Sequence, residues 1–398
     1  MNQPSRQLLI KLLDSWQKSP ERDRITRLPI TKARSPQYFA AVLPEDKEAL
    51  HAGLQEAEAM RTVLLEWGKG YDTHILKRIS LIDGPSLASY LGITLASKHA
   101  SDARYLLEGE LSGKEPWIND LVGYILERWS RNKGAAGIQP GDVLAGQRLI
   151  RAMEAVSAGR HRNLDLRTFS TREFNDSKVM ERMLSRFGSV WKRYHPSDLT
   201  SDELFETLGL VKFPQPLLLR GPVALQLIAR TLHCDGIQPF VGLPPQAIRG
   251  VIIDKQPSYV LTVENLASFN RYASEIQDGG LILYSAGFPA PGVADFLRML
   301  DSSLSSSIPF FHWGDIDEGG LKIFNYIQGL LTRTLRTHLM SSELLAIYGQ
   351  SNQKLRIKEV QRIADKNSEV SLIVEAILST NPPKTLEQEN IDPFGVLV

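Results

Sequence analysis

Acidic residues follow two apolar segments in the last third of the sequence. Glu264 comes directly after Tyr259–Val263, and Asp315 and Asp317 follow Pro309–Trp313. Residues i and i+2 of an extended segment project to the same side, so both aspartates are expected to face one way. Mg²⁺ is typically held through one or two protein carboxylates, which leaves its other positions for water and phosphate. The pattern therefore predicts a divalent metal site that acts on phosphodiesters, with Glu264, Asp315 and Asp317 as its catalytic residues and metal ligands.

Hydrolysis or transfer at a phosphodiester is the chemistry that such a site performs, because metal ions neutralise the developing charge and orient the attacking oxygen. Glu264 either ligates the metal or acts as a general acid or base, and the sequence does not separate these roles. Gly319 and Gly320 follow the aspartates. Since glycines have no side chain, a phosphate or the DNA backbone is expected to approach the helix N-terminus here closely.

Structural roles for the same residues compete with this interpretation. Asp317 has the position and residue type of a helix N-cap, and Asp315 is of a type that shapes turns. His312 precedes the motif and is either a further ligand or, as we favour, a packed residue that faces into the sheet. An isolated Asp-x-Asp is common, and only its placement after a parallel strand with a matching upstream glutamate favours a metal site.

Alternating strands and helices are expected to position these acids from about residue 236 onward. Apolar strand candidates cover residues 259–263, 281–285 and 309–313. Helical segments are expected at about residues 265–277, 290–304 and 319–338. This alternation predicts a parallel sheet that is covered on both faces. Ligands of such sheets bind at the carboxyl ends of the strands, where the acids stand.

The upstream sequence is helical with few strands. Apolar residues at helical spacing predict helices at residues 8–16 and 121–129, a helix start at Pro44, and a hairpin over residues 63–67 and 74–82. A glycine-rich linker, residues 132–141, precedes a helix near 143–158, an arginine-rich segment to about 193 and a strand over residues 216–219. This order suits a winged-helix DNA-binding domain, as it does many other small α+β domains.

Composition and charge give the broad class. The chain has 398 residues, which predicts two or three domains, and no apolar run is long enough for a membrane span. Its single cysteine, Cys234, is expected to be buried and structural, and a cytoplasmic location follows from the lack of cysteine pairs. Residues 1–35 hold eight Lys and Arg against three Asp and Glu, and residues 148–193 hold eleven against five. These basic stretches are either nucleic-acid contacts or solvated helix faces. No ATP-binding loop motif occurs.

Three segments in order resemble one known family. They are Tyr259–Leu266, Leu281–Pro289 and His312–Gly320, and shorter similarities lie at residues 167–170, 174–178 and 386–389. The family is that of the JetD subunit of the bacterial Wadjet anti-plasmid system. The resemblance spans about residues 160–390, and its C-terminal part is the specific one.

The resemblance implies a relative of the type VI topoisomerase A subunit, a multidomain protein of α/β and α+β type. Its implied parts are an N-terminal arm (residues 1–135), a winged-helix domain (136–235) and a Toprim domain with a Rossmann-like parallel sheet (236–398). Toprim sites use a glutamate after one strand and Asp-x-Asp after a later one, which correspond here to Glu264, Asp315 and Asp317. The implied activity is Mg²⁺-dependent cleavage of double-stranded plasmid DNA, with Mn²⁺ as a substitute. The implied working unit is a homodimer recruited to a condensin-like SMC–kleisin–KITE complex that extrudes DNA loops.

The nucleophile is where the sequence departs from the topoisomerases, which attack DNA with a winged-helix tyrosine. Tyr194 is the one tyrosine in residues 143–215, and its surroundings do not resemble that motif. We therefore expect water as the nucleophile, with a topoisomerase-like transesterase or a non-catalytic DNA-binding adaptor as the alternatives. Arg167, Arg172 and Lys178 are candidate phosphate contacts, and a salt-bridged helix surface is the competing interpretation.

Overall fold

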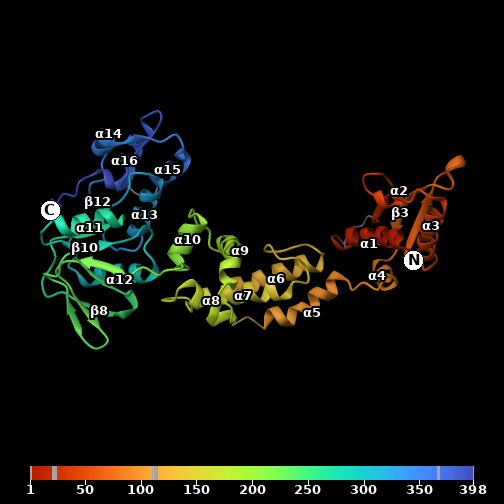
Figure 1. Ribbon diagram of the computed structural model, residues 1–398, viewed down its shortest axis with the longest axis horizontal. Coiled ribbons are helices and arrows are strands. Elements are labelled where there is room, and N and C mark those ends of the chain that lie inside the picture. The colour runs from red at the N-terminus through yellow and green to blue at the C-terminus, as the bar shows by residue number, and fades with distance from the viewer. Residues whose placement is uncertain (1, 20–24, 110, 112–114, 365–367, 398) are drawn as a thin grey trace. The chain divides into compact units, whose positions relative to one another are not determined.

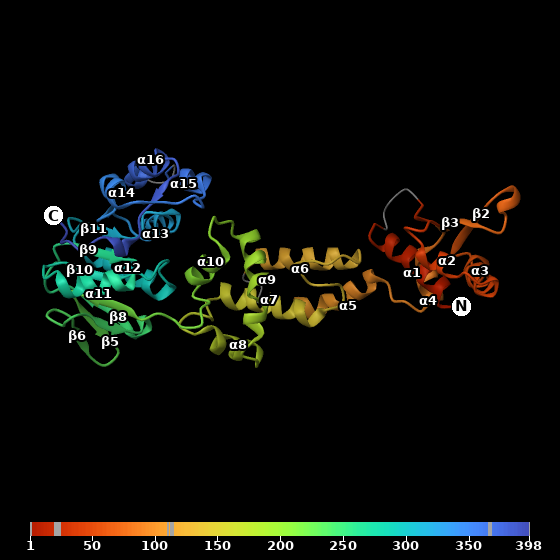
Figure 2. The same cartoon turned by 45° about the horizontal axis from the view of Figure 1, so that its top comes forward.

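The computed structural model describes residues 2–19, 25–109, 111, 115–364 and 368–397. It divides into two compact units, which Figures 1 and 2 show as ribbons. Unit 1 comprises Met1–Gly159 and Arg182–Pro196, and unit 2 comprises Arg160–Glu181 and Ser197–Val398. No helix of the described residues is long and apolar enough to cross a membrane.

Unit 1 begins with a small α/β core. An antiparallel sheet of order β1-β3-β2 packs with four helices around buried leucines. The strands are β1 (Arg27–Pro29), β2 (Val63–Trp67) and β3 (Leu76–Leu81), and the helices are α1 (Gln3–Gln17), α2 (Pro36–Ala40), α3 (Pro44–Ala59) and α4 (Gly84–Leu91). The first helix, the helix start at Pro44 and the hairpin predicted from the sequence are all confirmed.

The rest of unit 1 is helical. It contains α5 (Ala96–Glu108), α6 (Pro116–Ser130), α7 (Val143–Ser157) and most of α9 (Val179–Tyr194). Gly146 of α7 faces the buried Trp129 of α6 and Leu107 of α5, and a methyl group there would lie 3.0 Å from Leu107 and 3.2 Å from Trp129. The glycine therefore permits the close packing of these three helices, and the helices predicted near residues 121–129 and 143–158 are confirmed.

A six-stranded sheet of order β12-β11-β9-β10-β4-β7 forms the centre of unit 2. Its strands are β4 (Leu217–Arg220), β7 (Val241–Leu243), β9 (Val260–Val263), β10 (Leu281–Tyr284), β11 (Phe310–Trp313) and β12 (Leu335–Thr337). Strands β9 to β12 run parallel, whereas β4 pairs antiparallel with β10 and β7 pairs antiparallel with β4 at one edge. The sheet is therefore mixed rather than parallel throughout.

Both faces of the sheet are covered at its centre. All four residues of β9 and all four of β11 are buried. Since successive strand residues point to opposite faces, burial of every residue requires packing on both sides. Figure 1 shows the helices that surround the sheet, α11 (Leu266–Glu275), α12 (Pro291–Ser303) and α13 (Glu318–Gln328). The three strands and the first two of the predicted helices are confirmed to within two residues at each end.

Two sequence predictions require correction. The helix expected over residues 319–338 ends at Gln328, and Leu335 instead pairs with Phe310 across β11 and β12. The leucines beyond Gln328 keep a helix-like spacing, but they pack from a loop and a strand. The sequence assigned the strand at residues 216–219 to the same domain as the helices before it. In the structure this strand is β4, and it pairs with β10 of the C-terminal sheet. Arg220 at its end donates to the carbonyl of Ala273 and pairs with Asp278, which fixes β4 to this sheet.

The remaining elements of unit 2 are short. Its other helices are α8 (Leu166–Phe174), α10 (Ser201–Leu208), α14 (Ser342–Tyr348), α15 (Ile357–Ala364) and α16 (Ser371–Leu378). A three-stranded sheet contains β5 (Ala224–Leu227), β6 (Thr231–His233) and β8 (Ile248–Ile252), and a two-stranded one contains β13 (Gln350–Ser351) and β14 (Lys384–Thr385). The three-domain division at residues 135 and 235 stays a prediction.

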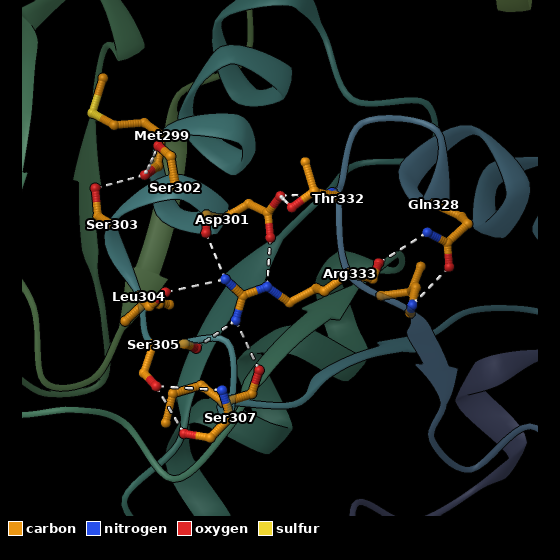
Figure 3. A network of polar contacts seen from close by, with 12 residues as sticks. Met299, Asp301, Ser302, Ser303, Leu304, Ser305, Ser307, Gln328, Thr332 and Arg333 are labelled. Carbon is orange, nitrogen blue, oxygen red and sulfur yellow. Dashed lines mark hydrogen bonds and ion pairs between the residues drawn. The ribbon is translucent and has the colours of Figure 1, made fainter.

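A buried ion pair joins two connections of the sheet (Figure 3). Arg333, before β12, bonds Asp301 of α12 and donates to the carbonyls of Leu304, Ser305 and Ile308. Asp301 also accepts from the backbone N–H and the hydroxyl of Thr332, each at 2.7 Å. The two charged side chains are only 13% and 4% exposed. Arg333 thus satisfies carbonyls at the end of α12 and holds the turn that leads into β12.

We predict that Arg333→Met destabilises the protein by about 3–5 kcal/mol, because it leaves the charge of Asp301 buried without its partner. Arg271→Met is the matched control, since Arg271 pairs with Glu275 on the surface with side chains 42% and 48% exposed. That control should lose much less stability, because ion pairs between exposed side chains contribute little. Urea unfolding followed by circular dichroism measures both, and equal losses in the two variants would contradict the expectation.

Candidate functional site

The two acidic segments leave the sheet side by side. Strands β9 and β11 are parallel neighbours, with Val263 opposite Trp313, and the N–H of Glu264 donates to the Trp313 carbonyl at 2.9 Å. The chain goes from β9 to β10 on one side of β9 and then crosses to β11 on the other side. This reversal of strand order is the point at which open α/β sheets bind their ligands. Glu264 and Asp315 therefore lie where the fold predicts a binding crevice.

The carboxylate of Glu264 contacts the backbone that carries Asp315. The N–H of Asp315 donates to Glu264 Oε2 at 3.3 Å. A Cβ on Gly314 would lie 2.5 Å from that same oxygen and 2.8 Å from His312 Nε2. Only glycine at position 314 leaves the space that the Glu264 side chain occupies. Sequence reasoning missed Gly314, although it directly precedes Asp315.

Asp317 has the capping role that the sequence offered as an alternative. It is the N-cap of α13, and its Oδ1 accepts from the N–H of Gly320 at 2.8 Å. Its charge nevertheless acts on the site, because it contributes to the raised pKa values of both Glu264 and Asp315. Position 320 requires glycine for a structural reason, because a side chain there would collide with the Asp315 carbonyl. Gly319 lies beside the Asp317 carboxylate at the start of the same helix.

A distant segment completes the site. Residues 386–389 lie against the ends of β9 and β11, and Leu386 forms a bridge with Ile316. Gln388 donates its N–H to Asp315 Oδ1 at 2.7 Å, and Glu389 accepts from the side chain of Asn265 at 2.7 Å. Sequence reasoning did not assign a role to these residues. The one signal for them was the family resemblance at Leu386–Glu389.

Burial and mutual repulsion raise the pKa values of the carboxylates. Burial raises the pKa of Glu264 to about 8, with the charge of Asp315 as a second cause. Burial likewise raises the pKa of Asp315 to about 6, and the charges of Asp317, Glu387 and Glu389 add to it. The N–H groups of Asp315 and Gln388 act in the opposite direction on Glu264 and Asp315 respectively. The site therefore gathers negative charge that the protein itself only partly compensates.

A crevice of about 600 Å³ opens in front of these acids. Its described lining has no Lys or Arg and consists of Glu264, Asn265, Leu266, Ala267, Asn270, Tyr284, Ala286, Gly287, Asp315 and Glu389. Ala286 has a positive φ of 59°, so the turn after β10 that forms one wall is held in the left-handed region. The crevice offers oxygen ligands and negative charge to a cation.

The donor set fits Mg²⁺, although the described residues contain no group of three or more His, Cys, Asp or Glu arranged as a metal-binding cluster. Mg²⁺ takes oxygen ligands, needs only one or two carboxylates and keeps several waters. Glu264 and Asp315 supply such oxygens in a crevice whose described lining has no basic side chain. The assignment of Glu264, Asp315 and Asp317 as metal ligands stays a prediction.

The other histidine and cysteine candidates are packed residues. His312 is fully buried, and its Nδ1 lies 2.8 Å from the hydroxyl of Thr262, as expected for a side chain that faces into the sheet. Burial lowers its pKa to about 3, so the ring is neutral. Cys234 is also buried, and burial raises its pKa to about 11. A thiol held protonated in this way is inert, in agreement with the structural role predicted for it.

Tyr194 packs within unit 1. Its ring lies 5.2 Å from that of Trp117, in a cluster with Trp191 and His195. Burial raises the pKa of its hydroxyl, which disfavours the phenolate that a nucleophile needs. Tyr194 therefore has a packing role in unit 1.

The candidate phosphate contacts lie on exposed surface. Arg167 and Arg172 belong to α8, Lys178 lies just before α9, and all three are exposed. Unit 1 contains a second basic feature, a pocket of about 500 Å³ whose lining includes Arg182, Arg186 and Arg193 of α9. The guanidinium of Arg193 lies 4.0 Å from the centre of the Tyr124 ring, and Arg186 donates to the Gly137 carbonyl at 3.0 Å.

The fold and the crevice define an α/β protein with an acidic site at the carboxyl ends of adjacent parallel strands. Residues 223–397 match the family described as the C-terminal part of Wadjet protein JetD. The Wadjet protein JetD of Bacillus cereus (strain Q1) is 23% identical over 297 residues, which cover 73% of this chain and 72% of that protein. Over residues 223–397 the chain is therefore similar to the C-terminal part of the JetD family.

We predict that the metal-free protein loses stability as pH rises from about 7 to 8. Glu264 has a pKa of about 8 when folded and an ordinary value near 4.5 when unfolded. The folded state therefore keeps a proton that the unfolded chain releases, and its stability falls across this interval. Below about pH 6.5 Asp315, whose pKa burial raises to about 6, acts in the same direction. The buried His312 and His338 act in the opposite direction there, because burial lowers their pKa values and only the unfolded chain binds their protons.

Urea unfolding in the presence of a chelator, at several pH values, measures this slope. Glu264→Gln should flatten it above pH 7, where Glu264 dominates, whereas the surface variant Glu275→Gln should leave it unchanged. A stability that is constant or rises over this range in the wild type would show that Glu264 is ionised at neutral pH without a bound cation.

Proposed function

We propose that this protein is a Mg²⁺-dependent DNA endonuclease subunit of a Wadjet-type defence system. One observation carries the proposal: Glu264 and Asp315 meet at the carboxyl ends of neighbouring parallel strands, in a crevice whose described lining has no Lys or Arg. The similarity to Wadjet protein JetD supports the assignment to a Wadjet system. We assign the C-terminal sheet, which includes β4, to a Toprim domain, and the helical part of residues 136–235 to a winged-helix domain.

The site residues would act as follows. Glu264, Asp315 and Asp317 would hold the metal, which when bound supplies positive charge to a phosphodiester in its transition state. Gln388 and the N–H of Asp315 hold two of these carboxylates in place. The raised pKa of Glu264 also suits proton transfer, so a general acid or base role for it stays within the proposal. Water is the proposed nucleophile, because Tyr194 is packed against Trp117.

DNA would be bound through phosphate contacts. The exposed Arg167, Arg172 and Lys178 are the proposed contacts in unit 2, and the pocket beside Arg193 is a further candidate in unit 1. Arginine forms bidentate hydrogen bonds with phosphate, so such surfaces suit a duplex backbone. Gly319 and Gly320 are proposed to let a phosphate approach α13.

The partners are proposed from the family. The substrate would be circular plasmid DNA, and an SMC–kleisin–KITE motor that extrudes loops would present it to a homodimer of this chain in the cytoplasm. Gating by the motor would leave the isolated subunit with weak activity. Rapid unassisted cutting of any plasmid by the isolated subunit would contradict the gating.

We predict that Glu264→Gln and Asp315→Asn each lower plasmid cleavage at least 100-fold in the presence of Mg²⁺ and the partner complex. Each variant removes an oxygen charge that the metal requires, while the side-chain shape is kept. Glu275→Gln is the surface control and should cut like the wild type. Undiminished cutting by both site variants would eliminate this site as the catalytic one.

The same assay separates the alternative functions. A topoisomerase-like transesterase would leave a covalent adduct between Tyr194 and DNA, which Tyr194→Phe would abolish. A non-catalytic adaptor would bind DNA normally and show no metal-dependent nicking by wild type under any condition. We expect neither outcome.

We predict that Arg172→Ala weakens duplex binding several-fold and lowers the slope of log Kd against log salt by about 1, because one phosphate contact is lost. Arg104→Ala is the control, since Arg104 is exposed on α5 and paired with Glu108. Fluorescence anisotropy of a labelled 30-base-pair duplex in a potassium chloride series measures both variants. An unchanged salt slope for Arg172→Ala would remove this residue from the interface.

A further inference from the structure

Gln388 is a buried glutamine that bridges the ends of two strands. Its side chain is 2% exposed. The Nε2 group donates to the Trp313 carbonyl at 3.0 Å, and Oε1 accepts from the N–H of Asn265 at 2.8 Å. Its own backbone N–H donates to Asp315 Oδ1 at 2.7 Å. One residue therefore contacts the end of β11, the residue after Glu264, and the Asp315 carboxylate.

The side-chain amide continues the pairing of β9 with β11 beyond the point where the strands separate. The last backbone bond of this pair runs from the Glu264 N–H to the Trp313 carbonyl. The amide of Gln388 uses the same carbonyl and the next N–H along, that of Asn265. It thus takes the place that a peptide group would occupy in the ladder. The amide therefore acts together with the bond from the Asp315 N–H to Glu264 Oε2 in setting the separation of the two chain segments that carry Glu264 and Asp315.

The backbone around Gln388 is itself held to the site. Ile316 and Leu386 exchange two backbone hydrogen bonds, at 2.8 and 3.1 Å. The carboxylate of Glu389 accepts from Asn265 Nδ2 on the other side. Because hydrogen bonds hold the residues on both sides of Gln388, the fold fixes the position of its side chain.

We propose that Gln388 is a positioning residue for the metal-binding carboxylates. Its amide helps to fix the distance between Glu264 and Asp315, and its N–H binds Asp315 Oδ1, which orients the carboxylate of this crevice-lining residue. Buried amides of this kind are costly to leave unpaired, so the three bonds act as a unit. The metal-binding part of this inference rests on the proposed function, whereas the bridge itself does not.

The test uses Mn²⁺ binding to the full chain, followed by electron paramagnetic resonance, with melting temperature measured in parallel. Gln388→Met keeps the length and apolar volume of the side chain but has no amide. We expect it to weaken Mn²⁺ binding at least tenfold and to broaden the signal of the bound ion. Gln388→Asn keeps the backbone bond to Asp315 but is one methylene too short to span both strands, and it should weaken binding by a smaller factor.

Two controls separate this inference from the proposed function. Gln277→Met alters an exposed glutamine and should bind Mn²⁺ like the wild type. Glu264→Gln should abolish binding. If the wild type binds no Mn²⁺, or if Glu264→Gln binds normally, the proposed metal site is wrong. If both of these behave as expected while folded Gln388→Met and Gln388→Asn bind like the wild type, the positioning role of Gln388 is wrong and the metal site stands.

If the Gln388 variants do not fold, a second measurement on the wild type tests the bridge. Hydrogen exchange of the wild type with and without Mn²⁺ reports on the Asn265 and Gln388 amides directly. We expect both amides to be protected without metal and to become more protected with it. Rapid exchange of these two amides in the folded wild type would overturn the bridge.

Discussion

The parallel pairing of β9 with β11 is the constraint on which the site depends. Carboxyl ends of parallel neighbours meet at one edge of the sheet, so the acids that follow these strands are forced together. Neither strand is exposed, and every one of their eight residues is buried. A shift in register by one residue would move buried side chains to the opposite face, and it would also separate Glu264 from Asp315. Packing of the core and geometry of the site are therefore fixed by the same contacts.

Bringing carboxylates together has an electrostatic cost that the surrounding structure only partly offsets. Backbone N–H groups of Asp315, Gln388 and Gly320 each donate to one of the acids. The pKa of Glu264 nevertheless rises to about 8. Elsewhere in this unit a buried carboxylate has a partner of opposite charge, as Asp301 has in Arg333. The contrast indicates that the uncompensated charge at the crevice is a property of the site and not of the fold in general.

The strands and most helices could be predicted because their signals are local. The runs that became β9, β10 and β11 are short and continuously apolar, which is typical of buried parallel strands, and Pro44 marks a helix start directly. The end of α13 at Gln328 was missed because Leu330, Leu331 and Leu335 keep a spacing that suits a helix. Their burial comes from packing on the sheet, which a local pattern does not reveal.

Within the site, the acids were predictable and their supports were not. Glu264 and Asp315 follow apolar strands, so their convergence followed from strand order once a parallel sheet was assumed. Gln388 lies 75 residues from its bonding partner Trp313, and no periodicity links the two. For Asp317 the sequence offered two roles as alternatives, and the structure combines them. The two interpretations of that aspartate were never exclusive: its carboxylate caps the start of α13, and its charge raises the pKa values of Glu264 and Asp315.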